Sequence, residues 1–323
     1  MKLILPYLLL LSACPFAYAQ TTYYVPDDFS TIQQAIDGSQ NGDTVIVRDG
    51  VYNEKIVFNS RRITLESENG SAVTTLTGAG IPSAPIVYFQ NGESSAAVID
   101  GFTIETGNAI NGGGIFIYQS SPTILNCNIS GNNADENGGG IYVTGGSPII
   151  SGCVINNNMC RQGGGIYSDT LIALENTSLT TNSASTKGGG LFLTGTANLN
   201  DVSVYDNYAY QGGGGVYCSG TISLFDVEIV ANRDSGGYTT KGTGVWAEDA
   251  DLSLHAVDIT GHMSGFSNNQ SDSNYGGAGM FLEYSVLVGE NVNISNNSIN
   301  RNYGGGIYFY SSSASLVDSA IDN

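Results

Sequence analysis

Residues 138–143 read Gly-Gly-Gly-Ile-Tyr-Val, and near copies of this stretch recur along most of the chain. The clearest copies begin 24 to 26 residues apart, and looser copies follow toward the C-terminus. The copies begin at Gly112, Gly138, Gly163, Gly188, Gly212, Gly242, Gly276 and Gly304. A fixed period of this size indicates a solenoid, in which each repeat is one supersecondary unit that stacks on its neighbours.

Each repeat also contains short stretches of alternating apolar residues and then a polar corner. Residues 149–155 are such a stretch, and Asn158 follows its last apolar residue by three positions. The corner series is Asn132, Asn158, Asn182, Asn207, Asn232, His262 and Asn297. Two short strands of period 2 and a corner in each repeat predict one coil of a parallel β-helix.

Asparagine suits a corner because it tolerates left-handed backbone geometry and can hydrogen-bond to nearby backbone. On coils stacked about 4.8 Å apart, such side chains can also hydrogen-bond to one another. We therefore predict a structural ladder of Asn132, Asn158, Asn182, Asn207, Asn232 and Asn297, with the ordinary turn preference of asparagine as the alternative.

The first residues predict export of the protein. Residues 1–19 contain Lys2, a short apolar run and an Ala-Tyr-Ala cleavage site, which together indicate a signal peptide. The segment is too short for a membrane-spanning helix. Residues 11–14 also resemble a lipoprotein box with a lipid on Cys14, which is the alternative to cleavage after Ala19. The expected location is the medium, the bacterial cell surface or the outer membrane.

The composition limits the partners. The chain has a net charge of −19, and charged residues make up only 12% of it. Nucleic acid and anionic lipid bind clusters of lysine and arginine, so they are not expected partners. Four cysteines follow the leader, and Cys127 and Cys153 share a repeat position that later repeats fill with Thr or Val. They are expected to be small buried side chains, with a disulfide bridge between the two stacked residues as the alternative. The sequence predicts no zinc site.

We predict one elongated, monomeric solenoid domain. Residues 20–111 form its N-terminal cap and first coils, and residues 112–323 form the Gly-rich repeats. In the first part, Ser30 is a candidate N-cap for a short helix whose apolar residues would cover the open end of the first coil. The sequence stops partway through a repeat, so we expect it to be truncated.

Two groups of residues resemble known families. Residues 31–70 and 99–104 resemble the N-terminal capping region and a strand segment of right-handed parallel β-helix proteins of the pectin-lyase-like superfamily. Residues 130–143, 180–193 and 205–218 resemble repeats of chlamydial polymorphic outer membrane proteins. The resemblance implies an all-β right-handed parallel β-helix, and it leaves the function open because the superfamily includes lyases, hydrolases, esterases, epimerases and adhesins.

An aromatic residue follows the first apolar residue of each Gly motif. If the apolar neighbours face the core, the aromatic rings face outward. Two insertions at the corner, residues 233–241 and 263–275, are expected to protrude side by side near the single Trp. We predict a binding surface for a glycan or a cell-surface protein formed by Tyr217, Trp246, Phe281, Phe266 and Tyr275. The alternative is a ladder of rings that only stabilises the stack.

The sequence gives less support to catalysis. The resemblance implies that lyases of the superfamily use an Arg or Lys base with calcium-binding acids, and the candidates for proton transfer are Arg233, Lys241 and His262. Stacked carboxylates at equivalent repeat positions, Asp201 with Asp226 and Glu228 with Asp258, are candidate Ca²⁺ ligands, although solvated acidic faces are the preferred interpretation. No other cofactor is expected.

Two functions follow from these observations. The first is a non-catalytic β-helix that binds glycans or surface proteins, favoured by the regular repeat. The second is a polysaccharide lyase or related carbohydrate-active enzyme that acts on an acidic polysaccharide.

Overall fold

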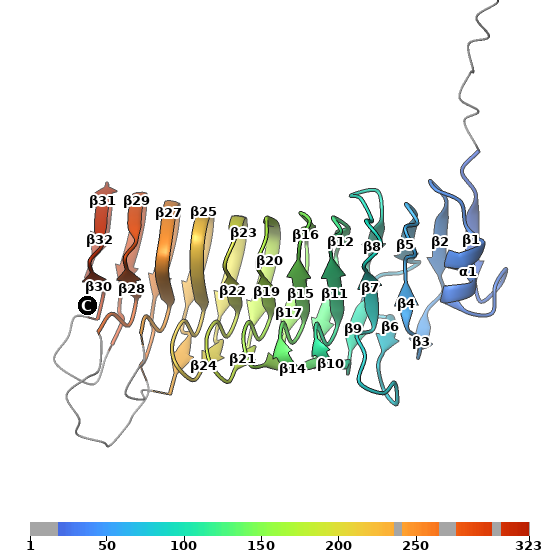
Figure 1. The fold of residues 1–323 in the computed structure, drawn as a ribbon, viewed down its shortest axis with the longest axis horizontal. Helices are drawn as coiled ribbons and strands as arrows, with labels where there is room; N and C mark the ends of the chain where they lie inside the picture. The colour runs from blue at the N-terminus through green and yellow to red at the C-terminus, as the bar shows by residue number, and fades with distance from the viewer. Residues whose placement is uncertain (1–18, 236–240, 265–275, 299–304, 323) are drawn as a thin grey trace, which may run out of the picture.

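The computed structural model describes residues 19–235, 241–264, 276–298 and 305–322. Within these ranges the chain forms an elongated stack of coils, with α1 and β1 at one end (Figure 1). Strands pair in parallel with their equivalents one coil away. The predicted parallel β-helix and its N-terminal capping helix are therefore confirmed. Nearly all of the predicted leader lies outside the described residues.

The strands form four columns along the solenoid axis, and each column contains one strand segment from successive coils. The first column carries the Gly motifs and contains β4 (Ile56–Val57), β7 (Val87–Phe89), β11 (Ile115–Tyr118), β15 (Ile141–Thr144), β19 (Ile166–Ser168), β22 (Leu191–Leu193), β28 (Met280–Glu283) and β30 (Ile307–Tyr310). The second contains β1 (Thr22–Val25), β2 (Thr44–Val47), β5 (Thr64–Ser67), β8 (Val98–Asp100), β12 (Thr123–Leu125), β16 (Ile149–Ser151) and β31 (Ser313–Val317).

The third column follows the second along each coil. It contains β3 (Gly50–Tyr52), β6 (Thr74–Thr77), β9 (Thr103–Glu105), β13 (Asn128–Ser130), β17 (Val154–Asn156) and β32 (Ala320–Ile321). Longer strands run through more than one column: β20 (Ile172–Thr180), β23 (Thr196–Tyr205), β25 (Val216–Val230), β27 (Val245–Thr260) and β29 (Val286–Ser295). The fourth column is a separate sheet beyond the asparagine corner: β10 (Asn108–Asn111), β14 (Asn133–Asn137), β18 (Met159–Cys160), β21 (Ser183–Ala184), β24 (Tyr208–Ala209) and β26 (Arg233–Asp234).

The helix α1 (Ile32–Gly38) covers the N-terminal end of the core. Its buried residues Ile32, Ala35 and Ile36 join the same hydrophobic cluster as the first coils. Thr31, and not the predicted Ser30, is the N-cap, because its hydroxyl accepts the Gln34 N–H at 3.2 Å. In the described ranges, no helix has the length and apolar character needed to cross a bilayer.

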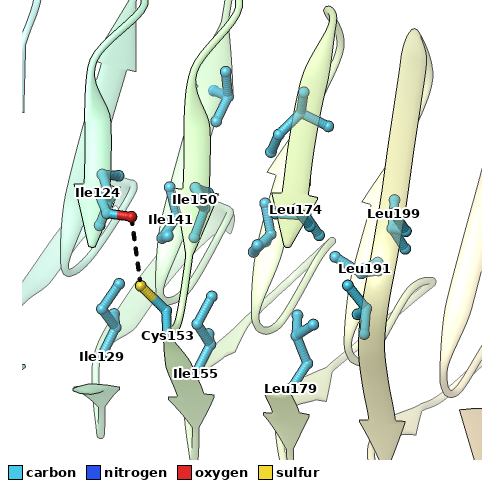
Figure 2. Packing of buried hydrophobic residues seen from close by; sticks show 14 of the residues in the cluster. Ile124, Ile129, Ile141, Ile150, Cys153, Ile155, Leu174, Leu179, Leu191 and Leu199 are labelled. Atoms are coloured by element: carbon cyan, nitrogen blue, oxygen red, sulfur yellow. Dashed lines mark hydrogen bonds between the residues drawn. The ribbon is translucent and has the colours of Figure 1, made fainter. Parts of the chain in front are cut away.

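The core is a continuous column of aliphatic side chains from successive coils (Figure 2). Alternation along each strand sends every second side chain inward, and parallel pairing stacks equivalent residues such as Ile150 and Leu174. The four cysteines outside the leader are buried free thiols, as expected of small core side chains. Cys153 donates a weak hydrogen bond from Sγ to the Ile124 carbonyl at 3.7 Å.

The asparagine corner differs from the prediction in one respect. The residue before each ladder position adopts the left-handed backbone conformation, for example Asn157 with φ 54° and Asp206 with φ 53°. The ladder asparagines themselves are absent from the positive-φ positions among the described residues. Asparagine therefore serves the ladder position through its side-chain amide and not through its backbone tolerance.

The ladder hydrogen bonds repeat from coil to coil. Asn158 Nδ2 donates to the Ile129 carbonyl at 2.9 Å and to Asn182 Oδ1 at 3.0 Å, and the Asn158 backbone N–H donates to the same Oδ1 at 3.0 Å. The ladder asparagines are almost fully buried. Each amide thus satisfies backbone groups at the turn that would otherwise be buried without partners.

Glycine is required where the coil passes from the fourth column to the first. Gly138 has φ +63°, and a Cβ there would lie 2.2 Å from the Ile141 carbonyl oxygen. A Cβ on Gly139 would lie 2.7 Å from the Met159 backbone nitrogen on the next coil. The repeated Gly motif therefore reflects the close approach of backbone to backbone at this turn.

Candidate functional site

An open groove of about 720 Å³ lies where the second column turns into the third. The backbone turns at residues with positive φ that line the groove on successive coils: Gly152, Asn176, Asp201, Asp226, Ala256 and Asn291. The outward side chains just after these turns, such as Ser203 and Glu228, also line it. Because the turns stack in parallel, the groove runs along the solenoid axis.

The groove is acidic. Asp201, Asp226, Glu228 and Asp258 line it, and its described lining contains neither lysine nor arginine. Glu228 and Asp258 are register partners on neighbouring strands, as the repeat spacing predicted. Asp258 Oδ1 also accepts a hydrogen bond from Asn293 Nδ2 at 2.9 Å. Within the described ranges, no group of three or more His, Cys, Asp or Glu side chains could hold a metal ion. A calcium site at these pairs remains a prediction.

The predicted outward aromatic residues form a continuous ladder on the first column. From Phe116 to Tyr217 the rings stack at centroid distances of 4.5 to 5.4 Å, with interplanar angles of 10° to 24°. Rings stacked in this way use their faces for each other, so mainly their edges are left for solvent. Trp246 is perpendicular to Tyr217, at 90° and 5.3 Å.

The predicted exposed platform at Tyr217, Trp246 and Phe281 is wrong, because these side chains are buried. Only 7%, 5% and 0% of their surfaces are exposed, and with Phe192 they form a second hydrophobic cluster outside the main core. The rings do point away from the core, as the alternation predicts, but other side chains cover them. For these buried rings, the structure agrees with the alternative prediction, in which the ladder of rings stabilises the stack of coils.

Two lysines outside the aromatic column, Lys187 and Lys241, help to cover these buried rings. The Lys187 ammonium lies 3.8 Å from the Trp246 ring centroid and 4.3 Å from the Tyr217 centroid. The Lys241 ammonium lies 4.9 Å from the Trp246 centroid and 5.0 Å from the Phe281 centroid. Each lysine also pairs with a glutamate, Lys187 with Glu248 at 3.2 Å and Lys241 with Glu283 at 2.6 Å.

The Lys–Glu pairs change the acidity of their neighbours. Burial raises the pKa of Tyr217 well above its ordinary value, and the hydrogen bond to Glu248 at 2.8 Å raises it further. Burial by itself would raise the pKa of Glu248, but the hydrogen bond from Tyr217 and the ammonium groups of Lys187 and Lys241 together lower it. Tyr217 therefore stays protonated and Glu248 stays ionised at neutral pH.

The three candidates for proton transfer have separate structural roles. Arg233 is exposed and pairs with Asp206. Lys241 is part of the cover over the aromatic rings. His262 is fully buried in the asparagine ladder, where its Nδ1 accepts the Asn232 backbone N–H at 3.0 Å. A role of these three residues in proton transfer stays a prediction.

Part of the predicted binding surface cannot be placed. Phe266 and Tyr275 lie outside the described residues, as do residues 236–240 and 265–275, which make up most of the two insertions. The described flanks of the insertions meet on neighbouring coils, since Arg233 bridges to Met263.

Two features of the surface were not predicted from the sequence. The groove was not predicted, although Asp201 and Asp226 at equivalent repeat positions pointed to its lining. The exposed tyrosines Tyr205, Tyr208 and Tyr210 were also missed, because they lie outside the regular motif. Their signal was the sequence Tyr-Asp-Asn-Tyr-Ala-Tyr at residues 205–210, in which tyrosines flank the ladder position.

Comparison with known proteins supports the fold. The family model described as the right handed beta helix region matches residues 56–234. No curated protein sequence matches the chain significantly.

Several solved structures resemble the fold at low identity. A pectin methylesterase from Aspergillus niger is 14% identical, with 94% of this chain and 89% of that chain covered and a TM-score of 0.35. A rice weevil pectin methyl esterase is 12% identical, with coverages of 90% and 88% and a TM-score of 0.38. The pectate lyase Pel9A is 14% identical, with coverages of 94% and 79% and a TM-score of 0.44.

The matched family region spans more than half of the chain, from β4 to β26. It includes the asparagine ladder from Asn132 to Asn232 and the Gly motifs that begin at residues 112 to 212. The matched family is right-handed, in agreement with the right-handed β-helix predicted from the sequence. The chain belongs to the right-handed β-helix family.

Proposed function

We propose that this protein is an exported, non-catalytic β-helix that binds neutral glycans along the groove between the second and third columns. The observation that carries the proposal is the groove itself, about 720 Å³ in volume and continuous across coils from Gly152 to Asn291. At a coil spacing of about 4.8 Å, the six turning residues extend over roughly 24 Å, enough for a short oligosaccharide along the axis. Export rests on the predicted leader, residues 1–19.

The lining of the groove suits sugar hydroxyls. Carboxylates accept hydrogen bonds from hydroxyls, Asn176 and Asn291 supply amides that donate and accept, and Ser178 and Ser203 supply further hydroxyls. Val154 and Ala256 add apolar surface between these polar groups. A few convergent polar groups on a partly apolar wall are typical of small-molecule sites.

The charge of the groove selects against acidic sugars. A uronic acid placed beside Asp226 and Glu228 would meet like charges on a protein whose net charge is −19. Neutral glycans avoid this repulsion. The charge therefore separates the proposed ligands from those of an enzyme acting on acidic polysaccharide.

The test is a binding measurement with the mature protein on neutral and acidic oligosaccharide panels, with and without Ca²⁺. Ser203→Trp should fill the groove and weaken binding of a neutral ligand at least tenfold. Ser223→Trp is the matched control, because Ser223 is also a half-buried outward serine on the neighbouring strand but lies outside the groove lining. Absence of binding to any neutral glycan would refute the proposal, and binding limited to acidic glycans would do so as well.

A second candidate is a polysaccharide lyase. The observation in its favour is the cluster of Lys187, Tyr217 and Glu248, in which Lys187 Nζ and the Tyr217 hydroxyl both donate hydrogen bonds to Glu248 Oε2. A lysine, a phenol and a carboxylate in contact are groups that can transfer protons. Release of unsaturated products from acidic polysaccharides, lost in Lys187→Met, would favour this candidate over the first.

A further inference from the structure

Three tyrosines project from a single stretch of one coil, residues 205–210. Tyr205 ends β23, Tyr208 opens β24, and Tyr210 follows β24 directly. Their exposed fractions are 47%, 37% and 56%. Tyr217, on the next strand β25, is only 7% exposed. Unlike the ladder rings, none of the three contacts another ring or a cation among the described residues. No aromatic or cationic group among the described residues therefore stacks on their faces.

Tyr205 lies on the strand face that borders the groove. Tyr205 and the groove residue Ser203 point to the same side of β23, because side chains two residues apart on a strand share a face. The chain then turns at Asp206 and the buried Asn207. Tyr208 and Tyr210 project from the next strand segment on either side of the inward Ala209. Tyr205 thus continues the groove face of its strand, and Tyr208 and Tyr210 follow it on the same coil beyond the corner.

The backbone that carries the tyrosines is held on both sides. Asn207 donates from its backbone N–H to Asn232 Oδ1 at 2.8 Å and from Nδ2 to the Leu179 carbonyl at 2.9 Å. The backbone N–H groups of Tyr208 and Tyr210 donate to the Asn182 and Ala184 carbonyls on the preceding coil at 2.9 and 3.1 Å. A rigid backbone positions the rings before a ligand arrives, which lowers the entropic cost of binding.

We propose that Tyr205, Tyr208 and Tyr210 form a stacking subsite for a neutral glycan that also occupies the groove; this inference rests on the proposed function. The aromatic strip is one coil wide. Ser183 and Ser185 precede Tyr208 and Tyr210 on the adjacent coil, and Arg233 and Ser235 follow them. A specific protein interface typically buries about 800 Å² on each partner around an apolar centre. At Tyr208 and Tyr210, a strip about 4.8 Å wide between polar rows matches a sugar chain instead.

The charges around the strip also favour a neutral ligand. Arg233, the register partner of Tyr208 on the next coil, pairs with Asp206 at the turn between Tyr205 and Tyr208. Arg161, two coils earlier, pairs with Glu136 at 2.6 Å. Both of these cations are therefore engaged by carboxylates. An apolar ring face with a hydroxyl at its tip suits the C–H face and hydroxyls of a neutral sugar.

The test uses titration calorimetry of the mature protein with the neutral oligosaccharide that binds best on the panel. Tyr208→Ala and Tyr210→Ala should each weaken binding roughly tenfold, the effect of losing a well-packed aromatic contact. Tyr208→Phe and Tyr210→Phe keep the ring and should stay within about threefold of the wild type. Tyr118→Ala is the matched control, because Tyr118 is also exposed, at 43%, but lies on β11 away from the strip.

The outcomes separate this inference from the function on which it rests. If the wild type binds no neutral glycan, the proposed function fails and the subsite fails with it. If the wild type binds and Ser203→Trp abolishes binding, but both alanine variants bind like the wild type, the subsite is overturned and the function stands. Tyr210→Ala keeps the test valid if Tyr208→Ala impairs folding, because Tyr210 is the most exposed of the three rings.

Discussion

The imidazole of His262 takes the place of an asparagine amide in the ladder, with Nδ1 accepting the backbone N–H of Asn232 at 3.0 Å. One coil earlier, the same kind of bond joins the Asn207 N–H to Asn232 Oδ1 at 2.8 Å. On the other side, the His262 backbone N–H donates to Asn297 Oδ1 at 3.1 Å, so the ladder continues through the histidine. Because Nδ1 accepts, the ring proton must lie on Nε2.

This geometry makes His262 sensitive to acid. Burial lowers the pKa of His262 to about 4 from the ordinary value of 6.5, although the Asn232 and Ile229 backbone groups oppose the lowering. Nε2 is buried, and no hydrogen bond of normal geometry from the described residues reaches it. A proton added to Nδ1 would face the Asn232 N–H, so protonation breaks this rung.

The first prediction concerns stability against pH. The unfolded chain binds the His262 proton near pH 6.5 and the folded chain only near pH 4, so the contribution of the neutral ring is complete above pH 6.5. It is lost progressively as the pH falls from 6.5 to 4, with a total of about 3 kcal/mol. Denaturant unfolding across this range should show a steeper loss for wild type than for His262→Asn. Equal slopes for the two proteins would show that His262 is not the titrating group.

The second prediction concerns the ladder amides. Asn182→Ala removes the bond from Nδ2 to the Ile155 carbonyl and leaves the Asn158 N–H without its acceptor. Because both backbone groups are buried, the free energy of unfolding should fall by about 1–3 kcal/mol. Ser183→Ala is the control on the next residue, whose side chain points outward. A wild-type melting temperature for Asn182→Ala would contradict the structural role of the ladder.

The third prediction concerns Trp246, which was predicted from the sequence to lie on an outward binding surface. Trp246 is 5% exposed and packs in the cluster with Tyr217 and Phe281. Trp246→Ala should therefore lower the free energy of unfolding by about 3–5 kcal/mol, as for other buried aromatic residues. Calorimetry against Tyr118→Ala, which removes an exposed ring, measures the difference. A change below 1 kcal/mol would mean that the aromatic cluster does not stabilise the fold.

The fourth prediction concerns the lysine cover. The Lys241 and Glu283 side chains are only 15% and 13% exposed, whereas the Arg161 and Glu136 side chains are 50% and 47% exposed. A double-mutant cycle with Lys241→Met and Glu283→Gln should give a coupling energy of about 1 kcal/mol or more. The same cycle on Arg161 and Glu136 should give less than about 0.5 kcal/mol, because water screens that pair. Similar couplings for the two pairs would contradict the burial of the first.

The fold could be predicted because the information is local and repeated. The period of the Gly motif, the alternation in residues 149–155 and the offset of Asn158 each determine one part of a coil, and stacking identical coils determines the rest. The predicted positions of the ladder asparagines were correct. The predicted role of their backbone tolerance was wrong, because the residue before each of them adopts the left-handed conformation. The sequence pattern alone does not separate the left-handed residue, such as Asn157, from the ladder residue that follows it.

The candidate site was predicted less well, because it depends on contacts between coils. Alternation correctly sent Trp246 away from the core, yet Lys187 covers it from 59 positions earlier in the chain. A long lysine side chain can lay its apolar methylene groups over a neighbouring surface while its ammonium group stays near water. No local sequence pattern specifies which surface it covers.

The sequence by itself determined the coil, its stacking direction, the inward face of each strand and the ladder position, since all of these follow from short-range periodicity. The tertiary structure alone decided which outward side chains are covered and which are free. Tyr217 and Tyr208 are both outward tyrosines on the same solenoid, but one lies under the Lys187–Glu248 pair and the other stays open to solvent. Exposure is a property of everything that surrounds a residue in space, and the surrounding side chains come from coils that lie far apart in the sequence.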